Sequence, residues 1–378
     1  MSQCIAVLFG GVSTEYIISL RSSFNIIQGL RSSGYEVICV GISKTGSWYR
    51  FDGDDQDILN DSWYEQAKNE AVRRYQDMGT AETRRSELAG LHSPRDWFIR
   101  LCGKTPDCIF PAVHGINCED GSLQGFLQLI GLPYVGSGVL ASAASMDKLH
   151  TKRILRDAGI RQCPFLAAKR ADIEKDIHCV ADQVEQEIGY PCFLKPSNGG
   201  SSVGTRCAAD RAELIDSLSY ASRFDRDVLI EPFIRAREIE VAVLGNHDLR
   251  TGALGEIATH DHAVYYDYQT KYFSSDGADV IIPASLPSKL EETILETACK
   301  AYQAIGCAGL ARIDFFIDLA TDALYLNEIN TLPGFTPISV YPKAFEKAGM
   351  PLATLTSQLC QLAVSEYQDR KRQESVDE

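Results

Sequence analysis

The sequence predicts an α/β region followed by an α+β region, and two patterns carry this prediction. Near the N-terminus an apolar strand at 5–9, an amphipathic helix at 15–30 and a second apolar strand at 37–41 follow one another. This is the βαβ unit that opens a parallel sheet. From residue 228 onward strand signals cluster around only two long helices, which is typical of an antiparallel sheet in an α+β domain.

Between residues 52 and 105 the chain is polar, with little periodicity apart from a candidate helix at 63–75, so we expect a surface excursion. An apolar strand is predicted at 108–114. A helix running to residue 130 follows, and Asp120 is its predicted N-cap because aspartate commonly accepts the first free N–H groups of a helix.

An alanine-rich helix is predicted at 141–158, because Gly159 is the kind of residue that ends helices. The apolar segments 191–195 and 203–207 flank the loop SNGGSS and predict an antiparallel hairpin. The remaining predicted elements are strands at 228–234, 239–245, 279–283, 311–318 and 323–330, and helices at 289–305 and 352–367.

A chain of 378 residues is long enough for two or three domains of ~150 residues each. We expect an N-terminal α/β domain over 1–136, which includes the polar excursion 52–105, and two α+β domains after it. These are a central domain over 137–226 and a C-terminal domain over 227–367, followed by a charged tail over 368–378.

The composition excludes several classes of protein. A net charge of -14 repels phosphate backbones and argues against a nucleic-acid partner. No apolar run approaches the ~18 residues of a membrane span, and the N-terminus lacks the basic region of a signal peptide. Twelve cysteines without a Cys-x-x-Cys pair predict reduced thiols. We therefore expect a cytoplasmic protein without a membrane partner.

The strongest local pattern is KPSNGGSSVG at 195–204. Its glycines let backbone N–H groups close around an anion, and Lys195, Ser201 and Ser202 add charge and hydroxyl donors. The loop joins two strands, so it is not a Walker loop. It indicates a phosphate site, and an ordinary hairpin loop is the alternative.

The strands ARIDFFID (311–318) and ALYLNEIN (323–330) carry the second pattern. Alternate residues of a strand share a face, so pairing Asp314 with Glu328 brings Arg312 opposite Asn330. A slip of one residue would separate the two acids. Two carboxylates and an amide are oxygen ligands suited to Mg²⁺. The alternative is a solvated strand face with a cross-strand ion pair.

Three shorter segments add polar groups. The loop NTLPGFTPIS (330–339) contains Gly334, whose N–H group could receive an oxyanion, although by itself it indicates only a rigid turn. Glu15 lies in the first turn of the predicted first helix, where acids usually offset the helix dipole. His114 ends a strand, where open α/β sheets bind ligands.

One motif favours a nicotinamide-dependent oxidoreductase. The segment GSGVLA at 136–141 matches G-x-G-x-x-A, and Asp157 follows at a suitable distance. Asp157 lies within a helical pattern and not at the end of a second strand. This context argues against a dinucleotide site.

Taken together, eight ordered motifs resemble the D-alanine–D-alanine ligases, which have the ATP-grasp fold. The resemblance runs from residue 5 to about 365, outside the excursion and the tail. Its motifs are GGVSTEYIISL, HGINCEDGSLQG, GSGVLASAASMDK, KPSNGGSSVGT, VLIEPFIRAREIEV, YYDYQTKY, ARIDFF and NEINTLPGFTPIS.

The resemblance implies that ATP lies between the central and C-terminal domains and phosphorylates the carboxylate of a first D-alanine. The amine of a second D-alanine then attacks the acyl phosphate, and the dipeptide enters peptidoglycan precursors. Two Mg²⁺ (or Mn²⁺) ions would be held by Asp314, Glu328 and Asn330. The nucleotide ligands implied are Lys148 and Lys195 for phosphates, Ser202 in the covering loop, Glu231, Phe233 and Ile234 for adenine, and Glu238 for ribose.

For the substrates, the resemblance implies that Glu15 holds the first ammonium group with His114 nearby. It implies Ser339 and the Val340 backbone for the second carboxylate, and Arg312 with the Gly334 N–H for the tetrahedral intermediate. The remaining implied residues belong to a mobile lid with Lys271 and Tyr272, and to a hydrogen-bonded triad of Glu15, Ser201 and Tyr272. A homodimer is the expected assembly.

Three features depart from the family pattern, and one of them is the segment 198–200, Asn-Gly-Gly, which varies the phosphate loop. Tyr16 stands where histidine is common, and Cys118 replaces a usual glycine beside the first-substrate pocket. Some segments also resemble D-alanine–D-serine ligases, which typically have arginine where this chain has Val340. The apolar Val340 favours D-alanine as the second substrate, and D-serine is the alternative. A non-catalytic nucleotide-binding module is disfavoured, because the expected metal ligands and Arg312 are all present.

Overall fold

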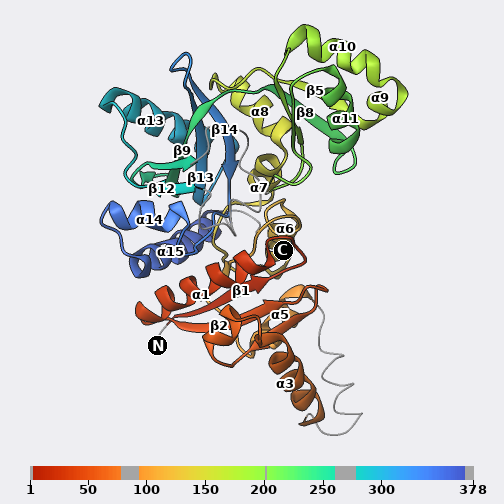
Figure 1. Ribbon diagram of the computed structural model, residues 1–378. Coiled ribbons are helices and arrows are strands. Elements are labelled where there is room, and N and C mark those ends of the chain that lie inside the picture. Colours follow the sequence, from red (N-terminus) through yellow and green to blue (C-terminus); the bar gives the residue numbers. More distant parts are fainter. Residues whose placement is uncertain (1–2, 78–92, 201, 260–277, 371–378) are drawn as a thin grey trace, which may run out of the picture.

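Three β-sheets, each covered by helices, make up the fold of this computed structural model, which describes residues 3–77, 93–200, 202–259 and 278–370. In Figure 1 the N-terminal sheet (red and orange) lies at the bottom, the central sheet (green) at the upper right, and the C-terminal sheet (teal and blue) at the left. The expected order of an α/β region followed by α+β regions is confirmed.

The N-terminal sheet has the strand order β3-β2-β1-β4. Strand β1 (Cys4–Gly10) pairs in parallel with β2 (Glu36–Ile42) and β4 (Cys108–Pro111), and helix α1 (Tyr16–Ser32) connects β1 to β2. The predicted βαβ unit is therefore confirmed. An antiparallel edge strand, β3 (Trp48–Phe51), was not predicted from the sequence.

The expectation of a surface excursion at 52–105 was wrong in part. This segment contains α2 (Asp55–Leu59), the predicted helix α3 (Trp63–Asp77) and α5 (Pro94–Cys102). Trp63 and Phe98 are fully buried. Helix α3 has only a few apolar residues among many charges, so its contribution to the core produces little periodicity in the sequence.

Two helix boundaries differ from the prediction. Helix α6 (Ser122–Ile130) has Gly121 as its N-cap, and Asp120 lies one residue earlier, where its carboxylate accepts the N–H groups of Ser122 and Asn117. The chain therefore turns before the helix begins, and Asp120 stabilises that turn.

The single helix expected at 141–158 is two helices, α7 (Val139–Met146) and α8 (Lys148–Asp157). Asp147 between them has extended backbone angles, and its carboxylate accepts the His150 N–H as an N-cap. Aspartate favours such caps over helix interiors, which explains the break. Asp157 is the last residue of α8 and does not follow a strand, which is the context that argues against a dinucleotide site.

The central sheet is antiparallel with the order β5-β8-β6-β7. The predicted hairpin is confirmed as β6 (Cys192–Pro196) and β7 (Arg206–Ala208). The other elements of this region are β5 (Leu166–Lys169), α9 (Arg170–Lys175), α10 (Ile177–Glu187), α11 (Arg211–Ala221) and β8 (Asp227–Pro232). Together they form a separate hydrophobic cluster.

The C-terminal sheet has the antiparallel order β12-β11-β9-β13-β14, with β10 paired to β9. Its strands are β9 (Ala236–Gly245), β10 (Arg250–Thr251), β11 (Gly255–Thr259), β12 (Ala278–Ile281), β13 (Gly309–Asp318) and β14 (Leu324–Asn330). Its helices are α13 (Ser288–Ile305), α14 (Val340–Lys347) and α15 (Leu352–Arg370). Helix α15 extends three residues into the predicted tail.

The N-terminal and C-terminal regions share one hydrophobic core, which contains Ile27 of α1 and Leu355 of α15. Figure 1 shows α15 beside α1 at this junction. A Cβ atom on Gly29 would lie 3.0 Å from Thr356 Oγ1, so glycine permits the close approach of the two helices. This packing brings α1 against the loop 331–339 that follows β14.

Candidate active site

The acidic face predicted from alternation forms between β13 and β14. Asp314 pairs with Glu328 and Arg312 pairs with Asn330 in the antiparallel register. A β-bulge follows immediately after Asp314, so the register holds where the polar residues lie and shifts beyond them. The register prediction is confirmed, and Ile313 and Ile329 lie buried on the opposite face.

A third strand adds two acids to this face. Glu240 of β9 pairs with Asp314, and Glu238 lies two residues away on the same face. Carboxylate oxygens of Glu238, Glu240 and Asp314 lie within 4.8 Å of one another. Sequence reasoning missed Glu240, although the alternation of EIE in β9 already put it on one face with Glu238.

Arg312 provides the balancing positive charge. Its Nε and Nη2 atoms donate to Asp314 Oδ1 and Oδ2 at 2.8 and 2.7 Å, and Nε lies 3.2 Å from Glu240 Oε2. Such a two-pronged contact orients the planar guanidinium strongly. The Arg312 guanidinium, which is expected to face a developing oxyanion, is therefore oriented by carboxylates of two strands, β13 and β9.

Two lysines meet at Glu231 in the interior. Glu231 Oε1 lies 2.7 Å from Lys152 Nζ and Oε2 lies 3.1 Å from Lys195 Nζ. Burial alone would raise the pKa of Glu231, but the charges of Lys195 and Lys152 lower it to about 2. The carboxylate thus holds two ammonium groups. Lys152 was missed by sequence reasoning, although it follows Lys148 by one helical turn on α8.

Lys148 and Lys195, the two expected phosphate ligands, experience the same charges. Burial lowers the pKa of Lys148 despite the attraction of Glu328. Burial acts on Lys195 in the same direction, but the charges of Glu231 and Glu328 raise its pKa overall. Lys195 also donates to Asn327 Oδ1 at 3.3 Å. Both lysines therefore lie in the electrostatic field of the acidic face.

The glycine-rich loop is docked on the start of α8. Lys148 Nζ donates to Gly199 O at 2.6 Å, and Ser197 accepts the Leu149 N–H and donates to Asp147. At the next residue of the loop, a Cβ atom on Gly200 would lie 3.3 Å from Glu15 Oε1. The loop therefore bridges the phosphate-ligand candidates and the first-substrate candidate.

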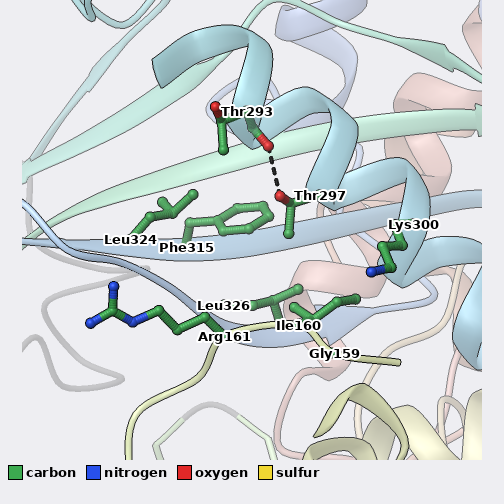
Figure 2. Close-up of a pocket in the computed structure, with 9 residues that line it drawn as sticks. All are labelled: Gly159, Ile160, Arg161, Thr293, Thr297, Lys300, Phe315, Leu324 and Leu326. Carbon is green, nitrogen blue, oxygen red and sulfur yellow. Dashed lines mark hydrogen bonds between the residues drawn. The ribbon is translucent and has the colours of Figure 1, made fainter. Parts of the chain in front are cut away.

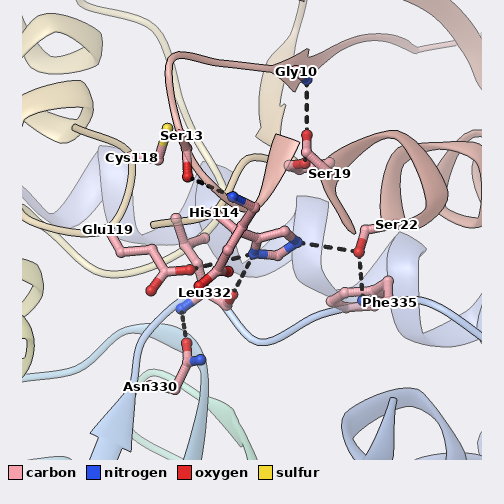
Figure 3. Close-up of polar contacts among 12 residues, drawn as sticks. Gly10, Ser13, Ser19, Ser22, His114, Cys118, Glu119, Asn330, Leu332 and Phe335 are labelled. Atoms are coloured by element: carbon pink, nitrogen blue, oxygen red, sulfur yellow. Dashed lines mark hydrogen bonds and ion pairs between the residues drawn. The ribbon is translucent and has the colours of Figure 1, made fainter. Parts of the chain in front are cut away.

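His114 lies buried in a second polar cluster, together with Glu15 and Glu119. Figure 3 shows His114 beside Glu119. Its Nδ1 atom lies 3.0 Å from Leu332 O and 3.3 Å from Glu119 Oε1. Burial alone would lower the pKa of His114, but the hydrogen bond and charge of Glu119 raise it above its ordinary value. Glu119 was missed by sequence reasoning, although it belongs to the HGINCED segment.

The loop after β14 is compact. A Cβ atom on Gly334 would lie only 2.8 Å from Ser339 Oγ, so a side chain there would displace the Ser339 hydroxyl. Ser339 Oγ accepts the Thr336 N–H at 3.0 Å and also contacts Thr336 Oγ1 at 2.8 Å. Val340 opens α14, and its side chain is buried near Gly255, where a Cβ atom would lie 2.6 Å from Val340 Cγ1.

The other predicted site residues lie at the edges of this region. Asn330 Oδ1 accepts the Leu332 N–H at 2.9 Å, and the Phe233 N–H donates to Pro191 O at 2.9 Å. Ile234 and Ser202 are half-buried, and Ser202 has a positive φ of 58°. Ser201, Lys271 and Tyr272 lie outside the described residues.

A cavity of about 340 Å³ lies on the other side of the C-terminal sheet, between α13 and the β13–β14 hairpin (Figure 2). Phe315, Leu324 and Leu326 line it, with Arg161 and Lys300 at its edge. Phe315 follows Asp314 in the strand, so it points to the opposite face. No predicted site residue in the described part of the chain lines this cavity.

Comparison with protein families decides the relationship. The model for the D-ala D-ala ligase N-terminus matches residues 4–137, and that for the D-ala D-ala ligase C-terminus matches residues 154–361. The chain belongs to the D-alanine–D-alanine ligase family. It is 40% identical over 370 residues to a D-alanine–D-alanine ligase of Ruminiclostridium cellulolyticum, covering 98% of this chain and 97% of that relative.

Solved structures agree with this family. A VanG D-Ala:D-Ser ligase from Enterococcus faecalis matches with a TM-score of 0.80 and 31% identity, covering 96% of this chain and all of that chain. The D-alanine–D-alanine ligase from Coxiella burnetii matches with a TM-score of 0.77 and 31% identity, covering 98% and 96%. The expected ATP-grasp fold is confirmed.

Tyr16 and Cys118, two of the departures from the ligase family pattern, are both buried. Tyr16 donates to Asp61 at 2.8 Å and accepts the Trp63 Nε1–H at 2.9 Å, which ties the start of α1 to α3. Cys118 is buried against Gly11, and burial raises the pKa of its thiol to about 12. Cys118 therefore adds a neutral side chain beside the Glu15 and His114 cluster.

All twelve cysteines of this ligase family member are free thiols, as the spacing predicted. Among the described residues, no helix combines the length and apolar character needed to cross a membrane.

Proposed function

We propose that the chain is an ATP-dependent ligase that joins two D-alanine molecules into D-alanyl-D-alanine for peptidoglycan precursors. The observation that carries this proposal is the β13–β14 register, in which Asp314 faces Glu328 while Arg312 lies on the same face. The electrostatic influence of Glu328 on Lys148 and Lys195 adds support. The names of the relatives, among them those from Ruminiclostridium cellulolyticum and Acetivibrio thermocellus, agree with it.

ATP binds between the central and C-terminal sheets in this proposal. Lys148 and Lys195 bind its phosphates, and Glu231 holds Lys195 in position through their ion pair. The loop with Ser202 covers the phosphates. The adenine and ribose ligands are Phe233 and Ile234 by their backbone, Glu231, and Glu238.

Two Mg²⁺ ions, or Mn²⁺, are part of the proposal, and the donor set fits them. Asp314, Glu328 and Asn330 supply carboxylate and amide oxygens, the ligands that Mg²⁺ prefers. The carboxylates of Glu238, Glu240 and Asp314 also lie within 4.8 Å of one another, with Arg312 as the counter-charge. When bound, the ions neutralise phosphate charge during transfer.

The two amino-acid substrates lie along α1 and the loop 331–339 in this proposal. Glu15 binds the ammonium group of the first D-alanine, with His114 nearby. Ser339 and the Val340 backbone bind the carboxylate of the second. Its amine attacks the acyl phosphate carbon, phosphate leaves, and a proton is lost from the new amide nitrogen. Arg312 and the Gly334 N–H stabilise the oxyanion formed on the way.

The proposed lid closes over the phosphates through Lys271 and Tyr272, and the triad Glu15, Ser201 and Tyr272 links the lid to both substrates. These roles rest on the family resemblance, because three of these residues lie outside the described part of the chain. Lid closure would exclude water, which otherwise hydrolyses the acyl phosphate.

A second candidate function is a D-alanine–D-serine ligase, and the likeness to the VanG D-Ala:D-Ser ligase favours it. Val340 argues for D-alanine, because its side chain is buried against β11 and leaves little space for a longer residue. We therefore keep D-alanine as the proposed second substrate.

A substrate panel tests the function. ADP release is measured with Mg²⁺-ATP and D-alanine alone, then with D-serine or D-lactate added, and the products are identified by mass spectrometry. D-alanyl-D-alanine formed from D-alanine alone supports the proposal. Mixed D-alanyl-D-serine as the main product would favour the second candidate, and no D-alanine-dependent ADP release would refute both.

We also propose that the protein works in the cytoplasm as a homodimer, with domains over 1–136, 137–226 and 227–367. Sedimentation velocity tests the assembly: a homodimer has twice the chain mass of 41.7 kDa. A single species at the chain mass across micromolar concentrations would contradict it.

A further inference from the structure

Two side chains of α1 hold the backbone of Phe335 from both sides. Ser22 Oγ accepts the Phe335 N–H at 3.1 Å, and Asn25 Nδ2 donates to Phe335 O at 2.7 Å. Residues three positions apart lie on one face of a helix, so a single face of α1 makes both contacts. The partners are more than 300 residues apart in the chain.

Ser22 also contacts His114, and Figure 3 shows its hydroxyl between the imidazole and Phe335. The carbonyl of Leu332 can only accept, so Nδ1 of His114 carries a proton. In neutral His114 the other ring nitrogen, Nε2, therefore accepts a hydrogen bond from the Ser22 hydroxyl, with 3.1 Å between the two heavy atoms. The Ser22 hydroxyl therefore donates one hydrogen bond to His114 and accepts another from the Phe335 N–H.

The position held by Ser22 and Asn25 is next to Gly334. The Phe335 N–H and the Gly334 carbonyl belong to one planar peptide unit, so fixing that N–H restricts the backbone of Gly334. Glycine is conformationally permissive and does not restrict itself. The side chain of Phe335 is buried against Phe110 and Tyr341, with ring centroids 6.0 and 5.5 Å apart. The loop is thus anchored by packing and oriented by α1.

We propose that Ser22 and Asn25 are positioning residues that set the orientation of Gly334 relative to the substrates. The inference rests on the proposed function, in which the Gly334 N–H stabilises the oxyanion. Glu15 is the N-cap residue of the same helix. One rigid element therefore sets the distance between the group that binds the first substrate and the group that stabilises the intermediate, and small displacements of such groups cost much rate.

The test uses the full-length enzyme with the variants Ser22→Ala and Asn25→Asp. Ser22→Ala removes the acceptor of the Phe335 N–H. Asn25→Asp keeps the side-chain shape but replaces the donor with an acceptor facing the Phe335 carbonyl. Ser23→Ala is the matched control, because Ser23 is equally buried on α1 and its hydroxyl donates only within the helix, to Leu20 O.

We expect both variants to lower kcat by about 10- to 100-fold, with the KM for ATP changed by less than about twofold. Hydrogen exchange of the amides at 332–336 should accelerate in both, while the melting temperature stays close to that of Ser23→Ala. A general loss of stability would instead accelerate the hydrogen exchange of amides throughout the chain. If Ser22→Ala does not fold, Asn25→Asp still tests the positioning role, because Asn25 is only half-buried.

The failure of this inference is distinct from the failure of the proposed function. A wild-type enzyme that forms no D-alanyl-D-alanine refutes the function. An active wild type with unchanged kcat and unchanged exchange at 332–336 in Asn25→Asp refutes the positioning role. A fall in kcat of the same size in Ser23→Ala would also refute it, because that change removes no contact with the loop.

Discussion

Asp314 on β13 lies directly opposite Glu328 on β14, and the bulge in the strand pair begins only after this position. The two carboxylates therefore share a face with Arg312, whose guanidinium contacts Asp314 through two hydrogen bonds. This relationship joins the proposed metal ligands to the proposed oxyanion ligand in a single hairpin.

Glu328→Gln should lower kcat by about 100-fold or more with little change in stability, because it removes a charge that supports phosphoryl transfer. Glu328 is half-buried, so its loss creates no large cavity. ADP release with saturating D-alanine measures the effect. Cys299→Ala, on α13, is the control and should stay within about twofold of the wild type. Equal losses in the two variants would contradict the metal assignment.

Glu231→Gln should destabilise the fold by about 3 kcal/mol near pH 7, because it leaves Lys152 and Lys195 as buried charges without their partner. The pKa of Glu231 is lowered in the folded state to about 2. Its stabilising contribution is therefore present above its ordinary pKa and is lost as the pH falls from about 4.5 toward 2.

Urea unfolding of wild type and Glu231→Gln at several pH values measures this contribution. The difference in unfolding free energy should be constant from pH 6 to 8 and should shrink below about pH 4.5. A difference that does not depend on pH would mean that packing, and not the ion pair, is responsible.

Glu119→Gln should lower the pKa of His114, because the charge and hydrogen bond of Glu119 raise it against the effect of burial. A raised pKa means that protonated His114 stabilises the fold below its ordinary pKa near 6.5 and that this stabilisation is lost as the pH rises through the higher, folded-state value. NMR titration of the imidazole gives the shift directly. An unchanged pKa in Glu119→Gln would show that another group supplies the effect.

Trp63→Ala should destabilise the N-terminal region by about 3–5 kcal/mol, because Trp63 is fully buried and donates a hydrogen bond to Tyr16. A Cβ atom on Gly41 would lie 2.3 Å from its ring, which shows how closely the indole packs on β2. Chemical denaturation measures the loss. The exposed Val72 of the same helix is the control, and Val72→Ala should change stability by less than about 0.5 kcal/mol.

Much of the fold was predictable because its strands and helices have regular local patterns. The βαβ unit around α1 and the β6–β7 hairpin each follow from a short run of apolar residues and a glycine-containing turn. The prediction was wrong where a single residue outweighed the pattern. Asp147 divides one expected helix into two. Trp63 is fully buried, so part of the polar segment 52–105 belongs to the core.

The acidic face follows from local pattern alone, because the side-chain period of a strand is two and the polar residues of β13 and β14 obey it. The groups that surround this face and the proposed substrate sites depend instead on how distant elements pack together. Glu240 meets Asp314 through sheet order, Lys152 meets Glu231 across two elements, and Asn25 reaches Phe335 over 310 residues. Such pairs depend on how whole elements pack, and no local period in the chain encodes that packing.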